Sequence, residues 1–119
     1  MTADKLNKTL VKLLPKISDA YIEETEWQEG DFTGSHIVFG DVFFPYIVEC
    51  LNADDDTNTK KCFEVIEKIL KLDDDYANEV ITLSVLENLF YEQLDNDVMT
   101  LYMHEKTKSI FEQIENQNK

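Results

Sequence analysis

The sequence TKKCFEVIEKILKLDDDYANEVITLSVLENLFY, residues 59–91, decides the fold class of this chain. Its first half, residues 59–72, alternates apolar and charged residues with the spacing of an amphipathic helix. Its second half, residues 75–91, is apolar over more than half of a helical circumference and is therefore expected to be the central helix. The aspartates at 73–75 separate the two and can cap the second. Two helices joined by a short acidic turn predict an antiparallel pair.

Two further helices are predicted before this pair. Thr2 can cap a helix over residues 3–14. Pro15 suits the first turn of a second helix, which is expected to end near Trp27 with its glutamates facing outward. The apolar side chains expected to face the core are Leu6, Leu10, Leu13, Leu14, Ile17, Tyr21 and Ile22. The glycine-containing segment 29–35 is predicted to be a loop.

The apolar, β-branched segment HIVF at residues 36–39 is too short for a helix if the next helix starts at Gly40. We therefore expect an extended segment or a two-residue strand here. Asp41 is expected to be the N-cap of a third helix over residues 42–51, which tolerates Pro45 because that residue lies near the first turn.

The chain is expected to end in a short helix over residues 98–103 and a last helix from His104 to about Asn116. Only three glycines and two prolines occur, which favours long helices over many turns. The prediction is one all-α domain, residues 1–119, with six or seven helices in stacked antiparallel pairs. The arrangement is HEAT-like, although no motif repeats at a fixed period.

Acidic residues occur in blocks. The net charge is −14, from 25 acidic residues against 11 basic ones, and every basic residue is a lysine. Residues 19–31 and 73–97 carry acids and no lysine, whereas residues 1–18 hold four lysines and a single acid. The negative electrostatic field of such a surface repels nucleic acid and anionic membranes and attracts cationic partners. We therefore expect a protein partner of positive charge, with no nucleic acid and no membrane.

The two cysteines and the first 14 residues indicate in which cellular compartment the protein is expected. Cys50 and Cys62 fall at apolar helix positions, so we expect reduced, buried thiols, the alternative being a disulfide between them. The first 14 residues are lysine-rich and amphipathic, unlike a cleavable signal, and no run approaches the length of a membrane span. These features predict a cytoplasmic protein.

The two acidic turns invite a calcium interpretation, but their spacing argues against it. A calcium loop needs a glycine at its sixth position and a glutamate at its twelfth. Counted from Asp54, these positions hold Thr59 and Val65, and a count from Asp73 fits no better. The aspartates are instead expected to cap the helices that follow them. No metal or other cofactor is predicted.

Histidine is scarce, which argues against catalysis. His36 and His104 are the only histidines, and no Cys–His spacing typical of a zinc site or a nucleophile–base pair occurs. His104 is expected to precede the last helix. His36, close to Asp41 in the sequence, is either an ordinary satisfied polar contact or a functional residue. A hydrolase that uses an acidic pair stays open, but nothing singles out a pair, so we expect no enzyme.

Aromatic residues concentrate between the second and third predicted helices. They are Trp27, Phe32, Phe39, Phe43, Phe44 and Tyr46. Most must be core, but aromatic anchors beside a surface of one charge sign are also typical of a protein-binding site. The residues predicted to contact a partner are Glu23, Glu24, Trp27, His36, Phe39 and Asp41, with Asp73, Asp74 and Asp75 as a second acidic contact.

Four short sequences carry a family resemblance: HIVFGDV at 36–42, PYI at 45–47, SVLE at 84–87 and YM at 102–103. Together with the two helices across an acidic turn, they resemble a family of small acidic bacterial proteins of unassigned biochemistry, over roughly residues 13–116. Its members are similar to cytoplasmic immunity proteins paired with secreted or contact-delivered toxins. The resemblance implies an inhibitor-type binding protein.

The charge pattern leads to the same expectation independently. Enzymes that act on nucleic acid present a cationic cleft, and an acidic inhibitor can cover it by placing carboxylates where phosphates would lie. We therefore expect a protein that neutralises a cognate basic toxin domain, such as a nuclease, by covering its active site. The alternative is an acidic helical adaptor that binds a basic peptide or protein without inhibiting it. The oligomeric state stays open.

Overall fold

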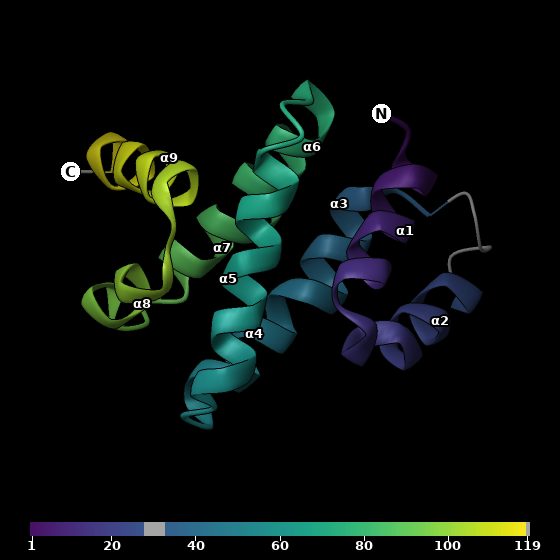
Figure 1. The fold of residues 1–119 in the computed structure, drawn as a ribbon, viewed down its shortest axis with the longest axis horizontal. Helices are drawn as coiled ribbons and strands as arrows, with labels where there is room; N and C mark the ends of the chain where they lie inside the picture. Colours follow the sequence, from purple (N-terminus) through teal and green to yellow (C-terminus); the bar gives the residue numbers. More distant parts are fainter. Residues whose placement is uncertain (28–32, 119) are drawn as a thin grey trace.

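The computed structural model describes residues 1–27 and 33–118, which contain helices and no strand (Figure 1). The elements are α1 (Ala3–Leu13), η1 (Pro15–Ile17), α2 (Ser18–Trp27), α3 (Ser35–Val38), η3 (Phe39–Phe43), α4 (Phe44–Asn52), α5 (Asp56–Leu70), α6 (Asp75–Val80), η4 (Ile81–Leu86), α7 (Glu87–Tyr91), α8 (Asn96–Tyr102) and α9 (Glu105–Gln117). Several of these are consecutive parts of one helix, so the described residues form seven continuous helices. The predicted all-α class is confirmed.

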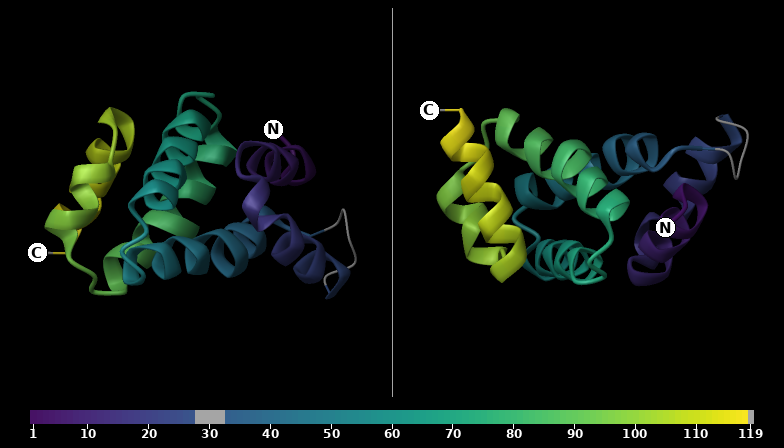
Figure 2. Two further views of the ribbon diagram at one scale, coloured as in Figure 1. Left: turned by 60° about the horizontal axis from the view of Figure 1, so that its bottom comes forward. Right: turned by 90° about the horizontal axis from the view of Figure 1, so that it is seen from above.

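Two layers of helices make up the domain (Figure 2). The front layer holds α1 and α5, and the rear layer holds the α3–η3–α4 helix and the α6–η4–α7 helix. The α5 helix and the α6–η4–α7 helix run antiparallel, as predicted from the acidic turn between them, whereas α4 crosses α5 obliquely. The last helix, α9, packs on one edge of both layers, against α5, η4 and α7.

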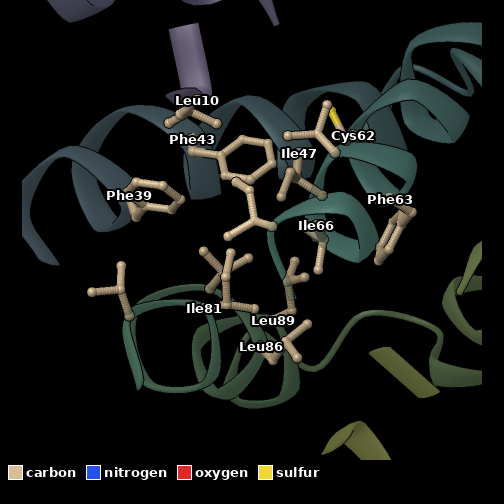
Figure 3. Close-up of a cluster of buried hydrophobic side chains, with 14 of the residues drawn as sticks. Leu10, Phe39, Phe43, Ile47, Cys62, Phe63, Ile66, Ile81, Leu86 and Leu89 are labelled. Atoms are coloured by element: carbon tan, nitrogen blue, oxygen red, sulfur yellow. The ribbon is translucent and has the colours of Figure 1, made fainter. Parts of the chain in front are cut away.

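The core lies between the two layers (Figure 3). Phe39 and Phe43 are fully buried and meet edge to face, with ring centroids 5.9 Å apart. Around them pack Leu10 of α1, Ile47 of α4, Cys62, Phe63 and Ile66 of α5, and Ile81, Leu86 and Leu89 of the α6–η4–α7 helix. Both cysteines are buried free thiols in this structure.

Side-chain caps hold the starts of four helices, and all but the one at Asp95 are predicted from the sequence. Thr2, Asp55, Asp74 and Asp95 each accept a hydrogen bond from the backbone N–H three residues later. The assignment of the acidic turns as caps is therefore confirmed. The helix predicted to start at residue 59 begins earlier, at Asp56, because Asp55 is its cap.

The expectation of an extended segment at residues 36–39 is wrong. A helix already begins at Ser35, and Gly34 in an extended conformation is its N-cap. Asp41 is therefore not an N-cap but lies inside the helix. Val38 and Phe39 are fully buried, and this burial outweighs the weak helix propensity of the branched residues.

A π-helical turn explains how this helix continues through Pro45. The backbone N–H of Phe44 bonds to the carbonyl of Phe39, five residues back, so the turn at η3 is wider than an α-turn. The irregular turn directly precedes the proline, whose missing N–H would interrupt a regular ladder. The η4 segment has the same irregularity, since the N–H of Glu87 bonds to the carbonyl of Thr82.

Two residues expected in the core are exposed. Ile22 of α2 is 52% exposed, because α2 lies at the end of the domain and packs mainly against η1, α3 and η3. Leu83 is 45% exposed because the wide turn at η4 moves the apolar face by one residue relative to a regular helix. Phe32 and most of the loop predicted at 29–35 lie outside the described residues.

Neither a membrane-crossing helix nor a metal-binding cluster occurs in the described residues. No described helix is both long enough and apolar enough to span a bilayer. No group of three or more His, Cys, Asp or Glu side chains there could hold a metal ion.

Candidate functional site: an acidic band around His36

His36 joins the two helices of the rear layer. Its Nδ1 lies 2.6 Å from the Oγ of Ser84 in η4, and its Nε2 lies 3.8 Å from Oε2 of Glu79 in α6. The ring also meets Tyr76 edge to face, with centroids 6.2 Å apart. The histidine therefore sits where the two π-helical turns pack together, with nearly half of its side chain exposed.

Two carboxyl groups, one on α2 and one on η3, also lie close to each other. Glu24 of α2 forms a side-chain hydrogen bond with Asp41 of η3. Burial, the charge of Asp41, that hydrogen bond and the charge of Glu23 together raise the pKa of Glu24 above its usual value. Glu24 therefore retains its proton more readily than an isolated carboxyl would.

Two more carboxylates lie on α6, the first part of the helix that packs against the α3–η3–α4 helix. Asp75 and Glu79 are exposed and lie four residues apart, which places them on one face of the helix. We call the surface formed by Glu23, Glu24, Asp41, Asp75 and Glu79 the acidic band. Ile37 and Leu83, 36% and 45% exposed, are large apolar residues on the two helices that meet at His36. Apolar side chains close to one-sign charge are typical of protein-contact surfaces.

The residues predicted from the sequence divide into three groups. Glu24 and Asp41 are close enough to interact, and Glu23 is exposed one residue away on α2. His36 has other partners, namely Ser84, Glu79 and Tyr76. Phe39 is fully buried, so its predicted role as a contact residue is wrong: it packs against Phe43 in the core. Trp27 ends α2, and its side chain lies outside the described part of the chain.

The acidic turn at 73–75 has mainly a structural role. Asp74 accepts hydrogen bonds from the N–H of Ala77 and from the terminal amine of Met1, at 2.9 Å each. These two bonds hold the pKa of the Asp74 carboxyl below its usual value. Asp73 ends the preceding helix with a positive φ of 55°. Only Asp75 of the three continues the acidic band.

Sequence reasoning missed Ser84, Glu79 and Tyr76 as neighbours of His36. One feature of the sequence hints at a contact there: Ser84 is a small polar residue within the most apolar helix of the chain. Its position opposite His36 depends on the wide turn at η4, which no sequence pattern revealed.

Ser84, His36 and Glu79 are the residue types of a nucleophile, a base and an orienting acid. The contact between Ser84 and His36 is also the one that a nucleophile makes with its base, but Ser84 is only 7% exposed, which leaves a substrate little access to its hydroxyl. The contacts of His36 with Ser84 and Glu79 hold two helices together, and we call them the His36 clamp. The clamp fixes the positions of the carboxylates on these helices.

Comparison with known protein families gives one match. A family model described as a domain of unknown function, DUF7674, covers residues 7–119. The chain belongs to the DUF7674 family. No curated protein and no solved structure matches it. The DUF7674 match begins within α1 and includes every residue of the acidic band and the His36 clamp.

Proposed function

We propose that this chain is a binding protein that recognises a cationic protein through the acidic band. The observation that carries the proposal is that Glu23, Asp41, Asp75 and Glu79 are exposed on neighbouring helices that carry no lysine. Negative charges gathered on one surface repel one another, and a lysine or arginine of a partner would relieve the repulsion. These carboxylates are therefore better suited to a partner than to the isolated domain.

The partner that fits this chemistry best is a basic toxin domain, such as a nuclease, that the chain neutralises in the bacterial cytoplasm by covering its active site. Carboxylates on the band would take the places of substrate phosphates, and the net charge of −14 would accelerate association. The clamp at His36 supports this role because it fixes the two helices that carry Asp41 and Glu79. A rigid surface loses little entropy on binding.

An adaptor that binds a basic peptide without inhibiting anything is the second candidate. The exposed Ile37 and Leu83 favour it, since they offer apolar contacts to a short segment as readily as to a folded domain. An activity assay on the captured partner separates the two candidates: an inhibitor abolishes the partner's activity, and an adaptor leaves it unchanged.

Charge reversal tests the proposal. The protein is co-purified with the product of its neighbouring gene, and the affinity is then measured for the double variant Glu23→Lys, Glu24→Lys. We expect at least about tenfold weaker binding, equivalent to roughly 1.4 kcal/mol. The matched control, Glu92→Lys with Glu112→Lys, makes the same change in net charge at two exposed positions outside the band. Equal losses in both variants would show that only net charge matters and that the band is not the interface.

A further inference from the structure

The lysines gather on the opposite side of the domain from the acidic band. Lys119 lies outside the described residues, and the other ten are on α1, η1, α5 with its C-cap, and the start of α9. The rear layer, which carries Asp41, Asp75 and Glu79, has none. Seven of these ten lysines belong to α1, α5 and the C-cap of α5, so a negatively charged ligand meets more cations on the front layer than on the rear layer.

A groove opens within this layer, between η1 and the first two turns of α5. It encloses about 630 Å³ and is lined by Leu14, Pro15, Lys16, Asp56, Thr57, Asn58, Lys60, Lys61 and Glu64. That volume lies within the range of about 300–1,000 Å³ typical of small-molecule sites. A second, smaller groove of about 270 Å³, which includes the 83%-exposed Leu101, lies on the other side of Lys60 and Glu64.

The larger groove, called here the α1–α5 groove, combines an apolar base with a cationic rim. The exposed ring of Pro15 supplies apolar surface, and Leu14, which is 1% exposed, closes the floor beneath it. The lysine side chains add their aliphatic stems and keep their ammonium groups in water. Such a combination suits a ligand with an apolar body and a charged end.

One lysine of the rim is available to an anionic end. Three lysines and two carboxylates line the groove. Lys60 is paired with Asp56 at 3.3 Å, and Lys16 interacts with Asp55. Lys61 is exposed and has no ion-pair partner among the described residues, so it is available to a carboxylate.

We infer that the α1–α5 groove binds a small molecule with an apolar chain and one terminal carboxylate, of the fatty-acid type. The chain lies against Pro15 and the aliphatic stems of the lysines, and the carboxylate bonds to Lys61, with Lys16 adding a second positive charge close by. This site is on the opposite layer from the acidic band and requires no protein partner. The result of its test is therefore independent of the proposed function.

Calorimetric titration of the full chain with decanoate tests the inference. We expect saturable binding of one decanoate per chain. Acetate, which has the carboxylate alone, and 1-decanol, which has the chain alone, should each bind at least about tenfold more weakly. An affinity for 1-decanol equal to that for decanoate would overturn the role of the lysines, and an absence of saturable decanoate binding would overturn the site.

Two variants locate the site. Lys16→Glu with Lys61→Glu should weaken decanoate binding at least about tenfold, whereas the control Lys68→Glu with Lys108→Glu changes the net charge equally at exposed positions outside the groove and should shift affinity less than about twofold. Thr57→Trp, at an exposed position in the groove lining, should block binding with the melting temperature unchanged. Unaltered binding in either groove variant would place the ligand elsewhere.

Discussion

Glu67 of α5 caps the N-terminus of α9 through Thr107. Its Oε1 accepts hydrogen bonds from both the backbone N–H and the hydroxyl of Thr107, at 2.9 Å each. Its Oε2 accepts from the backbone N–H of Lys106 at 3.1 Å. His104, at the N-cap position of α9, makes no side-chain capping bond, so a residue from another helix satisfies the free N–H groups instead.

Replacing this carboxylate should destabilise the whole domain. Glu67 is 4% exposed, and the variant Glu67→Gln turns an amide toward N–H donors that need an acceptor. Because hydrogen bonds to a charged group contribute about 1.5–3 kcal/mol, we expect a loss of about 2 kcal/mol in urea denaturation. Glu64→Gln, exposed on the same helix, is the control and should change stability by less than about 0.5 kcal/mol. Similar losses in the two variants would contradict the capping role.

The same contact predicts a pH dependence. Burial alone would raise the pKa of Glu67, but the hydrogen bonds from Thr107 and Lys106 outweigh it and hold the pKa below its usual value. A lowered pKa in the folded state means that the stabilisation is complete above the unfolded pKa of about 4.3 and is lost as pH falls through the folded pKa. The stability gap between the native chain and Glu67→Gln should therefore narrow below about pH 4 in melts recorded across that range. A constant gap would show that the charge is not responsible.

Leu86 and Leu83 should respond in opposite ways to truncation. Leu86 is fully buried between the layers, so Leu86→Ala removes core contacts and should cost about 2–5 kcal/mol. Leu83, three residues away, is 45% exposed, and Leu83→Ala should change stability by less than about 0.5 kcal/mol. Chemical denaturation of both variants checks the register of the helix after the π-helical turn. A large loss at Leu83 would indicate a regular α-helix there.

The Glu24–Asp41 contact can be measured directly. Asp41→Asn removes the neighbouring negative charge and should lower the pKa of Glu24, although burial keeps it from returning fully to its usual value. Carboxyl-detected NMR titration follows this residue by itself. Asp75→Asn, in the same band but on α6, is the control and should leave Glu24 unchanged. An unshifted Glu24 in Asp41→Asn would mean that the two carboxyls do not meet.

Regular periodicity explains which parts of the fold could be predicted. The α5 helix and the caps at Asp55 and Asp74 follow from local pattern, since spacing and side-chain chemistry within a few residues determine them. Only the second half of the helix from Ser35 to Asn52 is predicted, over residues 42–51. Its first half could not be predicted, because its start has no capping side chain and it passes through Gly40. Burial of Val38 and Phe39, a tertiary effect, stabilises it.

The candidate site was predicted in part for a similar reason. Glu24 and Asp41, which the sequence hypothesis places in one site, lie on adjacent helices and are close enough to interact. Ser84 and Glu79 are more than 40 residues from His36 and reach it only through helix packing. Phe39 is predicted as a partner contact because of its aromatic ring. A sequence pattern, however, does not distinguish an aromatic residue that contacts a partner from one that lies in the core.

The uneven placement of lysines has a practical consequence for mapping this protein. Trypsin has no cleavage site between Lys16 and Lys60 or between Lys71 and Lys106, so α2, the α3–η3–α4 helix and the α6–η4–α7 helix leave a digest as two long peptides. Amine-reactive cross-linkers would likewise label α1, α5 and the start of α9 and miss the acidic band entirely. Cross-linking of a captured partner to this domain therefore requires carboxylate-directed reagents, which react with the side chains of the acidic band.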